Sequence, residues 1–128
     1  MIGYAMFGTN DKARSLDFYD AVLATLGAKR SFATPTAQFY SGGSNPLGIG
    51  VCTPYDGAAA TVGNGAMIAL AAANRAQVDA AHAKAVELGA KDEGAPGVRG
   101  PDPDDPAGFY GAYFRDLDGN KLCVFKYG

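Results

Sequence analysis

The sequence is poor in the residues that build metal centres and disulfide frameworks. It contains a single histidine, His82, only two cysteines, and no tryptophan in 128 residues. A lone histidine cannot build an ordinary zinc site, because such sites combine several histidine and cysteine ligands. Cys52 and Cys123 lie far apart and form no CxxC motif. We therefore expect reduced thiols and a cytoplasmic location.

Long apolar runs and clusters of one charge are also missing. The longest uninterrupted apolar stretch, AMIALAAA at 66–73, is far too short to span a bilayer. The N-terminal MIGYAMFGTND has no basic segment followed by an apolar stretch, which argues against a signal peptide. Lysines and arginines are scattered, and the formal net charge is -2. These features argue against nucleic-acid and membrane partners.

What the chain does contain is an internal repeat. The tetrapeptide LGAK occurs at 26–29 and again at 88–91, each time at the end of a helical pattern that follows a strand-like run. So long a period in so short a chain indicates two copies of one supersecondary unit. We predict a single domain, residues 1–128, built from two modules at about 1–56 and 63–128.

Each module is predicted to contain a strand, a helix and three strands. In the first module the strands fall at 2–8, 29–33, 37–41 and 46–53, and the helix runs from the cap Asp11 to Gly27. In the second module the expected elements are a strand at 66–72, a helix from Asn74 to Gly89, a loop at 93–108, and a hairpin of strands 109–115 and 121–127. The predicted fold class is α+β: paired βαβββ modules form a cup-shaped mixed sheet with the helices outside.

Periodicity also predicts which side chains are buried. The helix stripes are Leu16, Tyr19, Leu23 and Leu26 in the first module, and Val78, Ala81, Ala85 and Leu88 in the second. Alternation in the last strand places Leu122 and Val124 under the helices, and Cys123 and Phe125 toward the cup. His82 is expected to be a partly exposed helix residue outside the cup. Asp102, Asp104 and Asp105 are expected to be solvated loop residues.

Two segments carry a family resemblance. DKARSLDFYDAVLATLG at 11–27 and YGAYFRDLDGNKLCVF at 110–125 resemble the glyoxalase / bleomycin-resistance / extradiol-dioxygenase superfamily, also called the vicinal oxygen chelate fold. The resemblance covers nearly the whole chain. It implies paired βαβββ modules, usually a homodimer, and in catalytic members a divalent metal in the cup. Bleomycin-binding members use the cup without a metal.

The same resemblance implies where metal ligands would stand. Catalytic members place a histidine on the first strand of each module and a glutamate just after the last turn; these positions hold Tyr4, Met67 and Cys123 here. A fourth ligand near Thr53 is also missing, because GIGVCT contains no carboxylate. Phenol, thioether and thiol groups suit zinc, nickel, manganese or iron poorly. No catalytic metal and no other cofactor are therefore expected.

These observations favour a protein that binds a small, partly apolar ligand in its cup. The candidate pocket residues are Tyr4, Met67, Cys123, Phe125, Tyr110 and Arg99. Arg99 could pair with a carboxylate or phosphate of the ligand, and the sequence leaves open whether Tyr110 or Tyr113 faces the cup. Three alternatives remain. They are a metal-dependent lactoylglutathione lyase-like lyase or glutathione/thiol transferase with unusual ligands, a copper(I) site at the three replaced positions, and a scaffold kept for dimerisation alone.

Overall fold

Each half of the chain forms the same succession of elements. The computed structural model describes residues 1–128. The first half contains β1 (Ala5–Gly8), α1 (Lys12–Ala24), β2 (Lys29–Ala33), β3 (Ala37–Ser41) and β4 (Ile49–Cys52). The second half contains β5 (Ile68–Ala71), α2 (Arg75–Glu87), β6 (Lys91–Val98), β7 (Phe109–Arg115) and β8 (Lys121–Tyr127). The predicted α+β fold of paired βαβββ modules is thereby confirmed.

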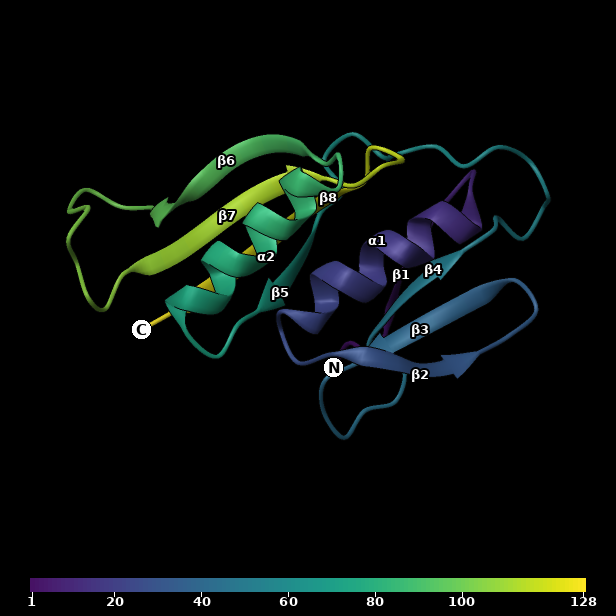
Figure 1. Cartoon of the computed structure of the whole chain (residues 1–128), viewed down its shortest axis with the longest axis horizontal. Helices are drawn as coiled ribbons and strands as arrows, with labels where there is room; N and C mark the ends of the chain where they lie inside the picture. The colour runs from purple at the N-terminus through teal and green to yellow at the C-terminus, as the bar shows by residue number, and fades with distance from the viewer.

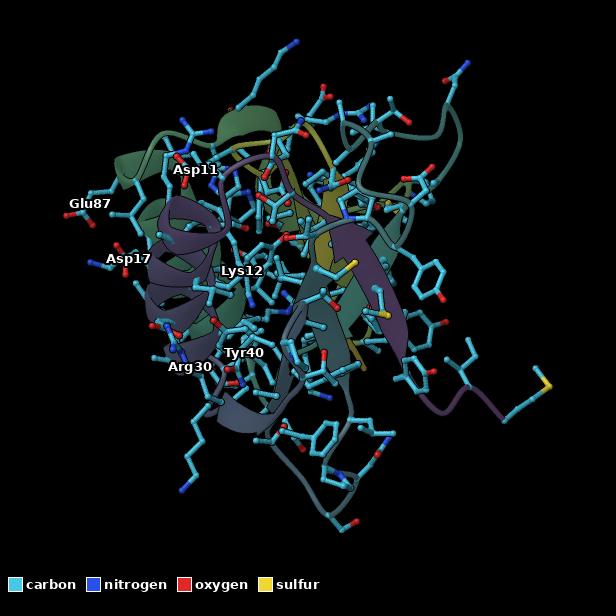
Figure 2. The ribbon with its side chains drawn as sticks, turned by 90° about the vertical axis from the view of Figure 1, so that its right-hand side faces the viewer. Asp11, Lys12, Asp17, Arg30, Tyr40 and Glu87 are labelled. Atoms are coloured by element: carbon cyan, nitrogen blue, oxygen red, sulfur yellow. The ribbon has the colours of Figure 1, made fainter.

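The strands form two sheets with equivalent topology. Their orders are β1-β4-β3-β2 and β5-β8-β7-β6, and in each sheet the first strand pairs in parallel with the last. The two helices lie on the same side of the strand layer (Figures 1 and 2). The mixed strand layer thus consists of two four-stranded sheets, one from each module, in which β1 and β5 are edge strands. Neither helix is long and apolar enough to cross a membrane.

Strand β6 differs from the sequence prediction, which placed a loop from residue 93 onward. Its sequence KDEGAPGV is rich in residues that disfavour strands. β6 nevertheless pairs with β7, with register shifts between Asp92 and Gly94 and between Gly94 and Gly97. Because β6 is an edge strand, Pro96 can be accommodated without breaking a ladder on both sides.

The helix boundaries follow the predicted caps. The Asp11 carboxylate accepts a hydrogen bond from the Arg14 amide at 3.1 Å, and the Asn74 side chain accepts one from the Gln77 amide at 2.9 Å. Both helices are followed by a glycine with positive φ, Gly27 at 77° and Gly89 at 103°. Such a backbone conformation favours glycine, which explains why each LGAK copy ends a helix.

The first module's strands β2 and β3 are fixed to α1 by a polar group of three side chains. Arg30 donates two hydrogen bonds of 2.8 Å to the Asp20 carboxylate, and the Tyr40 hydroxyl donates a third at 2.7 Å. Arg30 and Tyr40 meet near the end of α1 in Figure 2. Because the Arg30 guanidinium donates to it, the pKa of Asp20 is lowered from its usual value.

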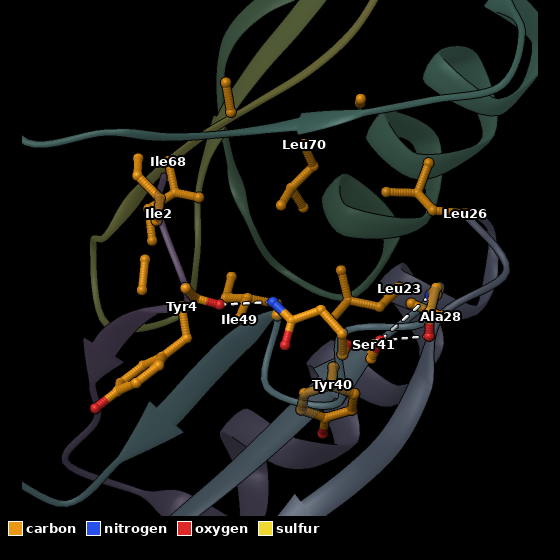
Figure 3. Close-up of a pocket in the computed structure, with 18 of the residues that line it drawn as sticks. Ile2, Tyr4, Leu23, Leu26, Ala28, Tyr40, Ser41, Ile49, Ile68 and Leu70 are labelled. Carbon is orange, nitrogen blue, oxygen red and sulfur yellow. Dashed lines mark hydrogen bonds between the residues drawn. The ribbon is translucent and has the colours of Figure 1, made fainter.

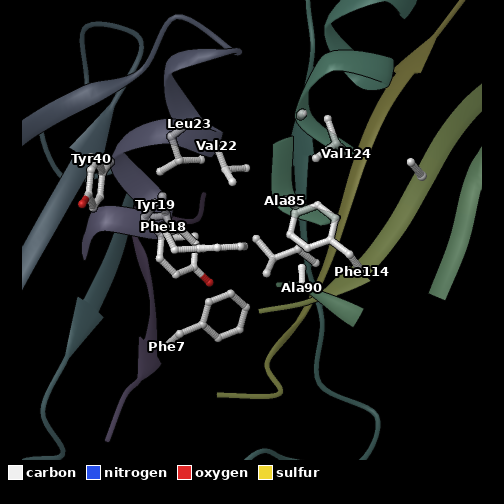
Figure 4. Close-up of a cluster of buried hydrophobic side chains, with 14 of the residues drawn as sticks. Phe7, Phe18, Tyr19, Val22, Leu23, Tyr40, Ala85, Ala90, Phe114 and Val124 are labelled. Atoms are coloured by element: carbon white, nitrogen blue, oxygen red, sulfur yellow. The ribbon is translucent and has the colours of Figure 1, made fainter. Parts of the chain in front are cut away.

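The hydrophobic core runs across both modules. Phe18 and Tyr19 of α1 face Phe114 of β7, and the ring centres of Phe18 and Phe114 lie 6.4 Å apart (Figure 4). The predicted stripes are largely buried, but Leu16 and Leu26 are only half-buried, and Leu88 is exposed. Phe18 and Val22 were missed because α1 also contacts α2, which widens its buried face.

A buried carboxylate in the turn that connects β7 and β8 links the modules. The Asp116 carboxylate accepts a 2.5 Å hydrogen bond from the Tyr19 hydroxyl and a 2.9 Å bond from the Asn120 side-chain amide. Its other oxygen accepts 2.9 Å bonds from the amides of Asp118 and Asn120. Burial, followed by the charge of Asp116, raises the pKa of Tyr19 well above its usual value. The phenol therefore remains a donor at neutral pH.

The same turn is hydrogen-bonded to the segment between β1 and α1. The Asp118 carboxylate accepts hydrogen bonds from the Thr9 hydroxyl at 2.6 Å and from the Asn10 amide at 2.9 Å. The Asn120 side chain donates to the Gly8 carbonyl at 3.0 Å. The DLDGN motif is thus both a hairpin turn and the main polar contact between the two modules.

Candidate functional site

Each sheet has one face that no helix covers. We call these two surfaces the open faces. In the first module the open face carries Tyr4, Met6, Phe32 and Phe39, and in the second it carries Phe109, Tyr113, Lys121, Cys123, Phe125 and Tyr127. Large apolar side chains remain well exposed there, including Tyr4 at 51%, Phe32 at 50% and Tyr127 at 68%. Such apolar surface is typical of a binding site.

A cavity of ≈ 780 Å³ lies between the β1 and β5 edges. Figure 3 shows its apolar lining, which includes Ile2, Leu23, Leu26, Ile49, Ile68 and Leu70. Two of the sequence-predicted pocket residues, Tyr4 and Met67, contribute to its wall, whereas Cys123, Phe125, Tyr110 and Arg99 do not. The cavity is large enough for a small organic molecule.

Cys123 lies on the open face of the second module but is covered by Tyr113. Cys123 is 1% exposed, and the pairing of β7 with β8 places Tyr113 directly across from it on the neighbouring strand. Burial raises the pKa of the Cys123 thiol. A protonated, covered thiol is a poor nucleophile, so the structure supports a packing role at neutral pH.

We expect Cys123 to resist alkylation. In a Cys52→Ser variant at pH 7, iodoacetamide should label native Cys123 at least about 100-fold more slowly than the urea-unfolded chain. Because the thiol pKa is raised, the rate should climb only as the pH rises above the usual thiol range. Quantitative mass spectrometry of the alkylated protein measures this rate. Rapid labelling of the folded protein at pH 7 would contradict the assignment.

Arg99 and Lys121 both lie beside the Tyr113 ring. The Arg99 guanidinium carbon is 5.3 Å from the ring centre, and the Lys121 nitrogen is 5.7 Å from it. Farther along the same face, Phe125 stacks on Phe109 with ring centres 5.1 Å apart. The structure therefore brings the predicted residues Arg99, Cys123 and Phe125 onto one open face.

Tyr110 was predicted to line the pocket, but it lies on the helix-facing side of this sheet. Its hydroxyl donates a 2.6 Å hydrogen bond to Asp79 of α2, and the Arg75 guanidinium carbon lies 4.8 Å from its ring centre. Tyr110 therefore packs against α2, and Tyr113 occupies the open face. The choice that the sequence left open between Tyr110 and Tyr113 is thus decided for Tyr113. Lys121 was missed as a site residue, although alternation along β8 from Cys123 could have indicated it.

His82 is buried, whereas the sequence suggested partial exposure. It is 9% exposed, and its Nε2 lies 3.0 Å from an Asp92 carboxylate oxygen. It sits between α2 and the helix-facing side of the sheet, where its ring lies 6.5 Å from Phe114. Asp102 and Asp104 are exposed, as expected, and the carboxylates of Asp102 and Asp105 accept hydrogen bonds from amides of their own loop.

The available donors do not fit a divalent metal of the glyoxalase type. No group of three histidine, cysteine, aspartate or glutamate side chains is placed to hold an ion. Tyr4 and Met67 offer a phenol and a thioether, and the Cys123 thiol is buried and protonated. Cys52, on the strand where a fourth ligand would stand, also has a pKa raised by burial.

Comparison with known proteins identifies related sequences and folds. The family model of the Glyoxalase/Bleomycin resistance protein/Dioxygenase superfamily matches residues 1–124. A glyoxalase/bleomycin resistance protein from Albidiferax ferrireducens T118 is 38% identical, with a TM-score of 0.86 over 100% of this chain and 99% of that one. A comparison with curated proteins finds no match.

More distant structures share the fold alone. A glyoxalase-related enzyme from Fulvimarina pelagi is 19% identical, with a TM-score of 0.71 over 98% of this chain and 87% of that one. A family enzyme from Burkholderia phytofirmans PsJN is 17% identical, with a TM-score of 0.70 over 98% of both chains. From the family match and the 38% identical relative, we conclude that the chain belongs to the Glyoxalase/Bleomycin resistance protein/Dioxygenase superfamily.

Proposed function

We propose that this protein binds a small, partly apolar molecule in a cup formed by its open faces, without a catalytic metal. The observation that carries the proposal is the chemistry at the expected ligand positions: Tyr4, Met67 and Cys123 replace two imidazoles and a carboxylate. The same side chains suit an apolar pocket, because thioether, thiol and aromatic groups pack well against irregular ligands. The two unpaired cysteines suit a reducing compartment, and we place this function in the cytoplasm.

The cup is proposed to need a second copy of the chain. In a single chain four residues of the open faces, Tyr4, Met6, Phe32 and Tyr127, are between 41% and 68% exposed. Pairing of two copies would remove this apolar surface from water, which is the main driving force for association. A closed cup between two copies would also exclude solvent from a bound molecule.

We predict a homodimer at micromolar concentration. Light scattering coupled to size exclusion should give twice the mass of the chain. Met6→Glu, which places a charge on the open face, should shift the protein toward monomer by weakening association about tenfold or more. Val86→Glu is the matched control, because Val86 of α2 is 42% exposed and Met6 is 41% exposed. A wild-type protein that stays monomeric would contradict the prediction.

An unbiased extraction tests the proposed function. Protein purified from cells and dialysed against a chelator is analysed by native mass spectrometry, and the bound fraction is then released by organic solvent. We expect a discrete added mass that survives chelation. If an added mass is present before chelation and is lost together with a metal ion after it, a metal-dependent enzyme replaces this proposal. If none is found under any condition, the scaffold alternative gains support.

A further inference from the structure

The open face of the second module carries an excess of positive charge. The strand register aligns Lys91, Arg115 and Lys121 across β6, β7 and β8, and Arg99 lies over Tyr113 beside them. The only acidic side chain in this group, Glu93, accepts a 2.7 Å hydrogen bond from Arg115. Arg99 and Lys121 have no carboxylate within ion-pair distance. This excess stands out in a chain whose net charge is -2.

The Arg99 side chain is held in place by the backbone of β6. Its Nη2 donates a 2.6 Å hydrogen bond to the Ala95 carbonyl. A Cβ at Gly94 would lie 3.1 Å from Nη2, and one at Gly97 would lie 3.2 Å from Nη1. The two glycines therefore let the guanidinium lie close against the strand. Since arginine has five N–H donors, others remain available to an incoming acceptor.

A stacked aromatic pair lies on the same open face as Arg99 and Lys121. Phe109 and Phe125 stack with an angle of 10° between their rings, and Tyr127 lies 6.1 Å from Phe109. Phe109 also covers Gly111, where a Cβ would approach its ring to 2.7 Å. Glycine at this position therefore leaves room for the edge of the Phe109 ring. A planar aromatic group can extend such a stack.

We propose that the ligand of this face is an aromatic carboxylate. The inference rests on the proposed metal-free binding function and names the ligand class of the same site. The carboxylate lies between Arg99 and Lys121 near the Tyr113 ring, and the aromatic body lies along Phe109 and Phe125. The planar guanidinium matches a carboxylate in two-point contact, and Lys121 adds a second charge. Binding would neutralise two cations that form no ion pair within the protein.

Calorimetric titration with two probes of the same shape tests this assignment. We expect 2-naphthoate to bind wild-type protein about tenfold or more tightly than the neutral 2-naphthamide, with an advantage that shrinks as salt is added. Arg99→Gln and Lys121→Gln should each reduce this advantage, and the double variant should abolish it. Lys84→Gln, which removes a charge from α2, should leave it unchanged.

The outcomes separate this inference from the proposed function. Equal affinity for the acid and the amide, or an advantage that survives in the double variant, would overturn the carboxylate assignment and leave metal-free apolar binding intact. Tighter binding of 2-naphthyl phosphate than of 2-naphthoate would overturn it in favour of phosphate esters. Failure of both naphthalene probes to bind would also overturn it, while the extraction experiment, which needs no probe, still judges the proposed function.

Discussion

Replacing Asp116 with alanine should lower the free energy of unfolding by about 3 to 4 kcal/mol. The buried carboxylate accepts four hydrogen bonds, including the 2.5 Å bond from the fully buried Tyr19. Alanine would leave these donors unsatisfied away from water, which costs more than the net worth of each bond. Urea unfolding followed by circular dichroism measures the change.

Asp17 provides the matched control. This aspartate points from α1 into solvent (Figure 2) and makes no ion pair, so Asp17→Ala should change stability by less than about 0.5 kcal/mol. Asp118→Ala should fall between the two, at about 1 kcal/mol, because its bonds to Thr9 and Asn10 are partly exposed. Equal stability of the Asp116 and Asp17 variants would refute the linking role of the DLDGN turn.

The second large effect is metal binding, which we expect to gain by introducing the family's ligand types at three positions. A triple variant with Tyr4→His, Met67→His and Cys123→Glu should bind Ni²⁺ or Zn²⁺ with a dissociation constant of about 1 μM or tighter, whereas wild type should show no comparable binding. Imidazole and carboxylate are the donors that these ions prefer. Isothermal titration calorimetry measures the affinity, and thermal melts check that the variant folds.

Cys123→Glu is the most difficult of the three substitutions, because Cys123 is buried. Cys123 is 1% exposed beneath Tyr113, so a glutamate there requires the phenol to move. The double variant Tyr4→His/Met67→His avoids this difficulty because both sites are about half exposed. It should fold like wild type and bind Ni²⁺ more weakly than the triple variant. A folded triple variant with no affinity for either ion would show that these positions do not converge in the assembled protein.

Local patterns predicted most of the fold. The LGAK repeat, the caps at Asp11 and Asn74, and the glycines that end both helices depend on neighbouring residues only. Alternation in β8 correctly placed Leu122 and Val124 in the core, where both are 0% exposed. Such signals are strong because helix and strand periods differ clearly.

The features that were missed depend on distant parts of the chain. β6 forms despite its glycines and proline because β7 pairs with it. His82 is buried because α2 packs on the second sheet and Asp92 supplies a hydrogen-bond partner. The positions of Arg99 and Lys121 beside Tyr113 likewise require three strands to be assembled. No periodicity within one segment contains that information.

Metal analysis of the wild-type protein tests the central claim most directly. Protein purified without chelator is analysed by inductively coupled plasma mass spectrometry, and its melting temperature is measured with and without EDTA. Because Tyr4, Met67 and Cys123 replace the expected ligands, we predict no stoichiometric zinc, nickel, manganese or iron and no change in melting temperature. One tightly bound divalent ion per chain, whose removal lowers the melting temperature, would contradict metal-free binding.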